Sequence, residues 1–454
     1  MDEHELMGKA PIPKAVMKMA VPSVISSLVT VLYNMADTFF VGQTGDPLQV
    51  AAVSLTNPIF ILMMAFANML GMGGSAVLSR ALGEKKEERA KNTSSFVTYA
   101  SLIIGILFAA VLIIFMDPIL ALFGANKQTY AFARGYTFHI SYGAPFIIWS
   151  AAASFIVRAE GASKEAMVGS MIGTIGNIVL DPIFISVLGQ GTAGAAIATT
   201  IGNVMASAYY LWYFLKKSHV LSIHWKYFKA GAGILTQTCS SGLPTAIFSA
   251  LMSVSTIVLN QLLVAYGNAP VAAIGIVFKA NMFITFLQMG LANGVQPLLG
   301  YSYGMGDMER FRGVERYTKK CCLIAGVAAT VFYFLLREPI IRIFISDEEV
   351  IAYGVEMLVA YMLSGPVIGF LFVNMNCMQS VGHAFPATVL SVLRQGILLI
   401  PLLYLLRAMF GLDGVILGQS VTDYIAVILS VILWIRIRKK LEKQPSRTSV
   451  PQYS

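Results

Sequence analysis

Residues 171–182 read M-I-G-T-I-G-N-I-V-L-D-P and lie in an apolar run, 166–188, whose only charged residue is Asp181. A run of this length and hydrophobicity predicts a transmembrane helix. Asn177 precedes Asp181 by one helical turn, so the amide and the carboxylate would share one face. A carboxylate at membrane depth costs at least about 2.5 kcal/mol. We therefore predict that Asp181 is half of an ion-coupling site; the alternative is a structural carboxylate hydrogen-bonded to neighbouring helices.

The composition is that of an all-α polytopic membrane protein. The 454 residues are 57% hydrophobic and 12% charged, with a mean hydropathy of +0.72, whereas soluble proteins are about 25% charged. Twelve apolar segments with turn signals between them predict twelve transmembrane helices. They fall near 14–42, 51–80, 93–116, 131–157, 165–188, 193–216, 234–266, 271–300, 317–336, 350–378, 386–407 and 413–437.

The basic residues predict the orientation of these segments. With the N-terminus inside, twenty-five of the 32 lysines and arginines fall on inward segments and five on outward ones. The positive-inside rule then places both termini in the cytoplasm of a multi-pass protein of the plasma membrane. The net charge of +9 is thus a topology signal and does not indicate nucleic-acid binding. We expect the basic tail to contact anionic membrane lipid.

A repeat divides the chain into two halves. Ala52, Gly73 and Gly83 recur 221 positions later as Ala273, Gly294 and Gly304, and one shift over separated regions indicates duplication. Six spans per half would insert the same way round, giving two six-helix bundles related by a pseudo-twofold axis along the membrane normal. We predict an N-terminal lobe at 1–216, a cytoplasmic linker at 217–233, a C-terminal lobe at 234–440 and a disordered tail at 441–454.

Polar residues of four spans in the first half lie at one depth. Counted along their helices, Asp37, Asp181, Thr199 and Tyr136 each lie roughly 7–11 Å below the outer end. Tyr33 is one turn from Asp37 on the same face. Together with Asn177, these side chains can meet in one pocket. Two carboxylates with amide and hydroxyl oxygens would suit Na⁺, at Asp37, Asn177, Asp181 and Thr199, but would equally hold a shared proton.

The second half has no acids that match those of the first, and the seventh span carries none at all. Lys279, Arg394 and Asp423 lie within its eighth, eleventh and twelfth spans. Charges inside a bilayer usually pair with one another. Asp423 could therefore pair with Lys279, which lies at comparable depth, or with Arg394 on the adjacent span.

Four motifs stand out in the chain: M-A-D-T-F-F-V-G at 35–42, V-R-A-E-G-A-S-K-E-A-M at 157–167, G-N-I-V-L-D-P-I-F-I at 176–185 and G-V-Q-P-L-L-G-Y-S-Y-G at 294–304. They resemble motifs of the multidrug and toxic compound extrusion (MATE) family, in its bacterial MepA-like and DinF-like branch. The resemblance covers nearly the whole chain and implies a V-shaped pair of bundles.

The resemblance also implies roles for individual residues. The family's amino-lobe cation site falls on Asp37, Asn177, Asp181 and Thr199, with the nearby tyrosines at Tyr33 and Tyr136. The family's bending proline of helix one falls on Pro22. An Asn that some relatives carry on helix four is Ser154 here. The carboxyl-lobe acids that another branch uses are missing, which places coupling in the amino lobe.

We therefore expect a secondary active antiporter that exports organic, often cationic and amphipathic drugs in exchange for H⁺ or Na⁺ by alternating access. The alternative is a flippase for a lipid-linked or anionic head group, held by Lys279 and Arg394. An enzyme is not expected, since the sequence shows no nucleophile–base pair or metal-ligand cluster, and no P-loop signature is present. We expect a monomer that needs no cofactor beyond its coupling ion.

Overall fold

The computed structural model describes residues 3–43, 46–218, 220–231 and 233–442, and these residues form no β-strand. The predicted disordered tail therefore lies almost wholly outside the described residues. The first half of the chain forms α1 (Glu3–Gly8), α2 (Ile12–Gly42), α3 (Pro47–Gly83), α4 (Glu87–Ile114), α5 (Met116–Leu122), α6 (Tyr130–Ala159), α7 (Ser163–Pro182), η1 (Ile183–Val187), α8 (Gly191–Lys216) and η2 (Trp225–Tyr227). The second half forms α9 (Ile234–Val264), α10 (Asn268–Gly304), α11 (Met308–Leu335), α12 (Arg337–Arg342), α13 (Glu348–Met362), α14 (Gly365–Ser380), α15 (Ala384–Val392), η3 (Leu393–Ile397), α16 (Leu399–Phe410) and α17 (Leu412–Glu442).

The twelve predicted spans correspond to these helices. Within the described ranges, ten helical stretches are long and apolar enough to cross a membrane, and the pair α13 and α14, bent by 47°, makes an eleventh. The remaining predicted span, 193–216, falls on α8, which is not among these helices but packs along α6 and α7. Pro366 lies in the first turn of α14, directly after the bend between α13 and α14, and α2 is one helix that includes Pro22.

Side-chain caps start several helices where the sequence changes from loop to apolar run. The carboxylate of Asp46 accepts a hydrogen bond from the Leu48 amide at the start of α3. Asp307 caps α11 in the same way through the Arg310 amide. Such caps satisfy amide donors that a helix leaves free in its first turn.

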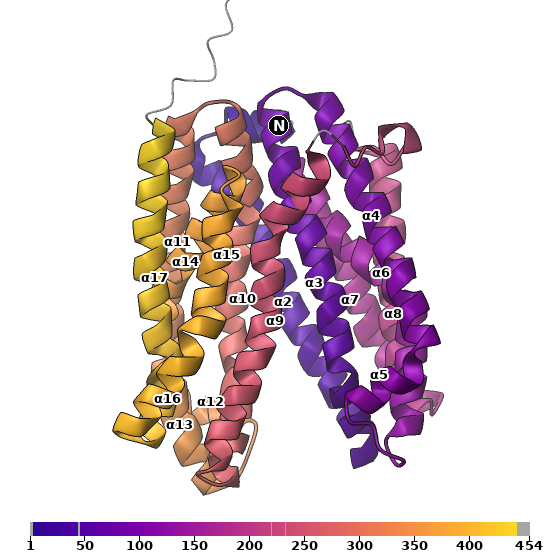
Figure 1. Ribbon diagram of the computed structural model, residues 1–454, viewed down its shortest axis with the longest axis vertical. Coiled ribbons are helices and arrows are strands. Elements are labelled where there is room, and N and C mark those ends of the chain that lie inside the picture. Colours follow the sequence, from indigo (N-terminus) through magenta and orange to yellow (C-terminus); the bar gives the residue numbers. More distant parts are fainter. Residues whose placement is uncertain (1–2, 44–45, 219, 232, 443–454) are drawn as a thin grey trace, which may run out of the picture.

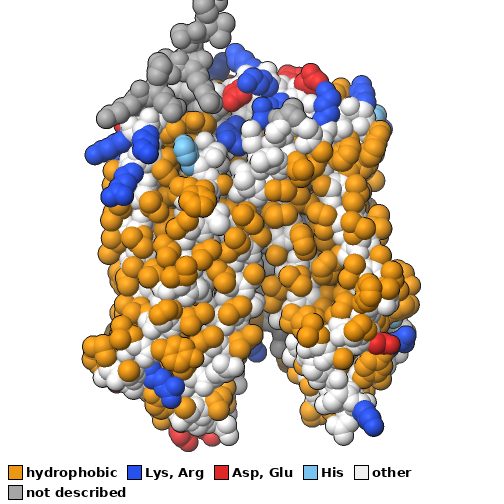
Figure 2. Space-filling model, viewed as in Figure 1, with side chains coloured by type: hydrophobic (Ala, Val, Ile, Leu, Met, Phe, Trp, Pro, Cys, Tyr) orange, Lys and Arg blue, Asp and Glu red, His pale blue; other side chains and the backbone are white. Residues whose placement is uncertain are grey.

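The two bundles diverge from one end of the molecule. Figure 1 shows α2–α8 on one side and α9–α17 on the other, with the N-terminus and the end of α17 at the end where the bundles meet. Figure 2 shows that the space between the lobes stays open at the opposite end when side chains are drawn, and that apolar side chains cover most of the flanks. Lysines and arginines gather at the closed end. This is the two-lobe, V-shaped architecture expected from the sequence.

Glycines allow the lobes to touch at the closed end. A Cβ atom on Gly73 of α3 would lie 1.8 Å from the Thr238 carbonyl oxygen of α9, and one on Gly294 of α10 would lie 2.8 Å from the Ala20 Cα of α2. Gly73 and Gly294 are repeat partners, so equivalent glycines make equivalent contacts across the interface. Only residues without a side chain permit helices to approach this closely.

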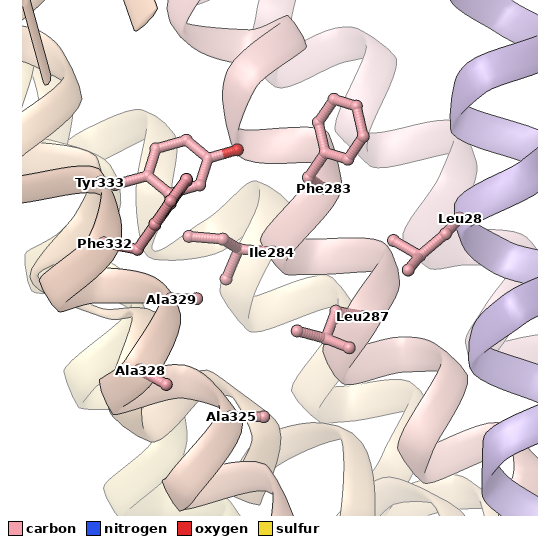
Figure 3. A pocket seen from close by; sticks show the side chains of 9 residues that line it. All are labelled: Leu28, Phe283, Ile284, Leu287, Ala325, Ala328, Ala329, Phe332 and Tyr333. Atoms are coloured by element: carbon pink, nitrogen blue, oxygen red, sulfur yellow. The ribbon is translucent and has the colours of Figure 1, made fainter. Parts of the chain in front are cut away.

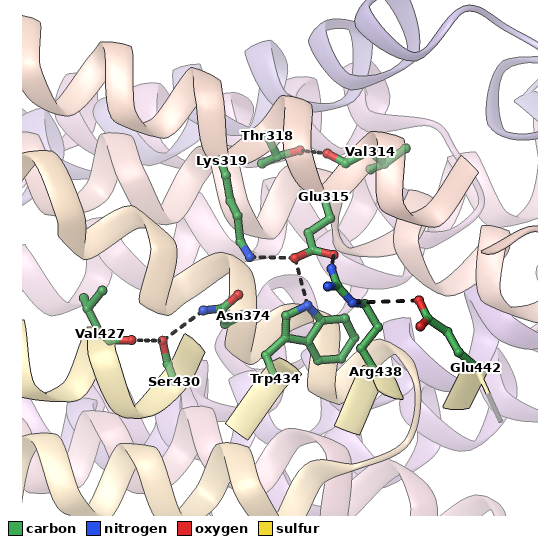
Figure 4. Close-up of polar contacts among 10 residues, drawn as sticks. All are labelled: Val314, Glu315, Thr318, Lys319, Asn374, Val427, Ser430, Trp434, Arg438 and Glu442. Carbon is green, nitrogen blue, oxygen red and sulfur yellow. Dashed lines mark hydrogen bonds and ion pairs between the residues drawn. The ribbon is translucent and has the colours of Figure 1, made fainter. Parts of the chain in front are cut away.

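A buried acid joins two helices of the C-terminal lobe. Glu315 of α11 accepts hydrogen bonds from the indole of Trp434 on α17 at 2.8 Å and from Lys319 at 2.6 Å (Figure 4). Arg438 of α17 lies 3.9 Å from its other carboxylate oxygen. Since Glu315 is only 3% exposed, this cluster ties α11 to α17 inside the bundle.

Candidate functional site

The polar site of the N-terminal lobe begins at the end of α7. Pro182 directly follows Asp181 and is followed by the π-helical turn η1. Proline has no N–H to donate, so it interrupts the helical hydrogen-bond ladder, and π turns of this kind are frequent at functional sites. Asn177 and Asp181 are 3% and 0% exposed. The shared face predicted from their spacing is thus turned into the lobe.

Hydrogen bonds connect α7 to α8 and α2. The Asn177 side-chain nitrogen donates to the hydroxyl of Thr199 at 3.1 Å, and Thr199 is also hydrogen-bonded to Tyr33. One turn along α8, Asn203 donates to the Thr199 carbonyl at 2.8 Å and accepts from Ser150 at 2.9 Å. A continuous polar network therefore runs from α2 through α8 to α6.

Ser150 is the member of this network that sequence reasoning did not single out. It follows the apolar residues 144–149 of α6 and precedes three alanines. A single polar residue in such a run is a weak signal, because serine is common at helix–helix contacts in membranes. Ser154, which stands where some MATE relatives carry an asparagine, is hydrogen-bonded to Tyr210 instead.

Asp37 completes the site from α2. Its carboxylate is close enough to Asp181 for the two to interact electrostatically, and both act on the hydroxyls of Tyr33 and Tyr136. Asp37, Tyr33 and Tyr136 are partly exposed, whereas Asp181 is fully buried. The structure thus brings together the six residues predicted from helix depth, one or two from each of four helices.

The site presents oxygen atoms that lack donors. Both carboxylate oxygens of Asp181 and the side-chain oxygen of Asn177 are buried and have no hydrogen-bond partner among the described residues. A buried acceptor without a donor costs about 1–3 kcal/mol, and more if charged. A proton or a cation would remove this cost. Within the described ranges no three His, Cys, Asp or Glu side chains cluster, so a cation here would combine two carboxylates with neutral oxygens.

The charged residues of the C-terminal lobe are arranged differently. Arg394 donates to Asp423 Oδ1 at 2.7 Å, and Gln419 donates to the same oxygen at 3.0 Å. Ser364, at the break between α13 and α14, donates to Oδ2 at 2.9 Å. Of the two partners predicted for Asp423, the structure therefore shows Arg394. Lys279 is exposed and forms no ion pair within the described part of the chain.

An apolar pocket lies apart from these polar groups. It has a volume of about 460 Å³ and lies between α2, α10 and α11 (Figure 3). Its lining is formed by Leu28, Phe283, Ile284, Leu287, Ala325, Ala328, Ala329, Phe332 and Tyr333. Pockets with aromatic and aliphatic walls suit the apolar part of an organic molecule.

Comparison with known proteins identifies the family. The MatE family model matches twice, at residues 22–183 and 244–405, once in each lobe. The chain belongs to the MATE family. The second match confirms the duplication inferred from the glycine repeats, since its offset of 222 positions is within one residue of the shift in the sequence.

Two curated relatives of this MATE protein are the multidrug export proteins MepA of Staphylococcus saprophyticus and of Staphylococcus aureus. They are 32% identical over 437 and 438 residues, covering 95% of this chain and 96% of each relative. A crystal structure of MATE in complex with MaL6 superposes with a TM-score of 0.93 at 25% identity and covers 98% of this chain and 100% of that one. An outward-facing multidrug resistance MATE transporter superposes at 0.90 with 25% identity, covering 98% and 99%. The protein is thus a multi-pass membrane protein similar to multidrug exporters.

Proposed function

We propose that this MATE protein is a secondary antiporter that exports organic, often cationic and amphipathic drugs in exchange for H⁺ or Na⁺. The coupling ion binds at Asp37 and Asp181. The observation that carries the proposal is the set of buried oxygens on Asp181 and Asn177 that lack donors. The relatives named as multidrug export proteins support the substrate class.

The coupling site acts through the charge of its two carboxylates. When both are ionised they repel each other and attract a proton or Na⁺. Binding removes this repulsion and lets Tyr33 and Asp37 move toward α7 and α8. Because both residues lie on α2, ion binding shifts that helix, and a ligand that prefers one conformation displaces the equilibrium toward it.

Alternating access follows from the V shape. Both termini face the cytoplasm, so the open end in Figure 2 faces outward and ions reach Asp37 from outside. Ion binding favours release of the drug to the outside, and return of the lobes carries the ion inward. The monomer completes this cycle without ATP or a bound cofactor.

A flippase for anionic head groups has less support. Arg394 would have to bind the head group, yet its charge is already compensated by Asp423 at 2.7 Å. Its guanidinium also lies over the rings of Phe248 and Phe372, at 5.2 and 5.7 Å from their centroids. This enclosure favours a structural role for Arg394.

Transport by purified protein in proteoliposomes tests the proposal. A pH gradient and a Na⁺ gradient are imposed separately while drug movement is recorded. We expect one gradient to drive transport in the unaltered protein and in Asp117→Asn, whose carboxylate lies on α5 outside the site. Asp37→Asn and Asp181→Asn should abolish driven transport. Full activity in either variant would refute the assigned site.

A further inference from the structure

The short helix α1 is fastened to the C-terminal lobe, although it precedes the N-terminal lobe in the sequence. Arg310 of α11 donates to the carbonyl oxygens of Met7 at 2.7 Å, Ala10 at 2.8 Å and Leu6 at 3.2 Å. Leu6 and Met7 lie in the last turn of α1, and Ala10 lies in the segment between α1 and α2. A cation at this position caps the helix, so one guanidinium holds both the end of α1 and the segment that follows it.

Packing reinforces this contact. Leu6 and Met7 are 1% and 0% exposed, and Arg310 itself is 9% exposed. A Cβ atom on Gly8 would lie 3.5 Å from the Tyr301 ring and 3.7 Å from the Met305 sulfur, both at the end of α10. The helix is therefore embedded in the closed end of the molecule and does not lie loosely on its surface.

Helix α2, which follows α1 directly, is shared between the lobes. Near its start, Ala20 and Val24 lie against α10: Cβ atoms on Gly294 and Gly290 would each be 2.8 Å from their Cα atoms. Near its end, Tyr33 is hydrogen-bonded to Thr199 of the N-terminal lobe. The helix that carries Asp37 thus begins on one lobe and ends in the other.

We propose that Arg310 is a positioning residue for coupling: through α1 it anchors the inner end of α2 to the C-terminal lobe. Because the inner end of α2 is fixed, a displacement of Asp37 and Tyr33 at the ion site moves the C-terminal lobe. Without the anchor, the same displacement would only shift α2 along its own axis. The inference rests on the antiport proposed above. It adds a residue at the opposite end of α2 from the ion site.

The same contacts indicate that the anchor stays attached during transport. Release of α1 would leave a buried guanidinium without acceptors and expose Leu6 and Met7, and both changes are unfavourable. Pro22 lies within the part of α2 that packs against α10, between Ala20 and Val24.

Spin-label distances across the open end test the anchor. Labels are attached at Lys127→Cys and Glu349→Cys, one on each lobe, after Cys239, Cys321, Cys322 and Cys377 are replaced. We expect a change of pH or Na⁺ to shift the distance distribution in the unaltered protein. Arg310→Gln, and a chain lacking residues 1–8, should reduce this population shift at least about fivefold. Arg310→Lys should retain part of it.

The matched control is Arg312→Gln, two residues along α11, whose side chain binds Glu442 near the surface. It should respond like the unaltered protein. In the Arg310→Gln background, a short reducible thiol cross-linker between Gly8→Cys and Met305→Cys should restore the response, and reduction should abolish it again.

The outcomes separate the two proposals. If neither pH nor Na⁺ changed the distance distribution between the labels in the unaltered protein, the antiport and the anchor would both be contradicted. A responsive unaltered protein with an equally responsive Arg310→Gln would contradict the anchor alone. The anchor is also overturned if the Gly8–Met305 cross-link arrests drug transport in protein that keeps Arg310, because α1 would then have to detach.

Discussion

The amide nitrogen of Asn177 lies 3.1 Å from the hydroxyl of Thr199, which joins α7 to α8 across the N-terminal lobe. This bond sets the orientation of the Asn177 amide: its nitrogen donates to Thr199, and its oxygen has no donor. That oxygen belongs to the same buried face as Asp181. The pair therefore orients a neutral oxygen toward the charged part of the site.

Thr199→Val should weaken ion coupling with little change in shape. The substitution leaves the Asn177 amide without its acceptor, at a cost of about 1–3 kcal/mol, and each 1.4 kcal/mol is about tenfold in affinity. We expect a tenfold or greater rise in the ion concentration for half-maximal drug transport. Thr200→Val is the control, because Thr200 instead bonds the His139 carbonyl. Equal effects of both variants would contradict a specific role for Thr199.

Removing one member of the Arg394–Asp423 pair should destabilise the C-terminal lobe. The pair is buried, and breaking such a pair costs about 3–5 kcal/mol. Asp423→Asn alone should lower the thermal unfolding temperature, whereas the double variant Arg394→Met with Asp423→Leu should recover most of it. Drug transport by the double variant should persist. Loss of transport at full stability would favour the flippase, with Arg394 as a ligand.

Gly73→Ala should disturb the closed end of the molecule. The new Cβ would lie 1.8 Å from the Thr238 carbonyl oxygen, so α3 and α9 must separate. We expect a lower unfolding temperature and faster labelling of Cys239, which lies next to Thr238 on α9 and is only partly exposed. Gly275→Ala on α10 is the comparison: its Cβ meets no atom within 4 Å, and alanine favours helix by about 1 kcal/mol. An unchanged rate of Cys239 labelling in Gly73→Ala would argue against this interface.

Glu315→Gln should loosen the contact between α11 and α17. The variant can still accept from Trp434 but leaves Lys319 without its counter-charge and Arg438 with Glu442 alone, and a broken buried pair costs about 3–5 kcal/mol. Thermal unfolding in detergent should show a clear decrease. Glu338→Gln, which removes an exposed pair with Arg342, should leave the unfolding temperature unchanged. Equal decreases would show that burial does not matter here.

The sequence predicted the features that depend on local spacing. Apolar runs predicted the spans, and Asn177 with Asp181 fell on one face because they are four residues apart. The orientation inferred from the charge asymmetry stays a prediction. Counting depth along the helices also placed Thr199, Tyr136 and Asp37 together.

Contacts between segments far apart in the sequence could not be predicted from local spacing. Arg310 binds carbonyls about 300 positions earlier, and no periodicity relates the two. The choice of Arg394 over Lys279 as partner of Asp423 depends on how α15 and η3 pack against α17, and depth alone left both open. The bend implied by Pro22 stays a prediction, since α2 is one continuous helix through this residue.

Ion release on drug binding tests the shared carboxylate site most directly. Drug is added to purified protein in weakly buffered solution, and released protons and Na⁺ are counted separately. The account predicts release of one ion species from the unaltered protein and from Asp117→Asn, and none from Asp37→Asn or Asp181→Asn at saturating drug. Equal release from all four proteins would contradict it.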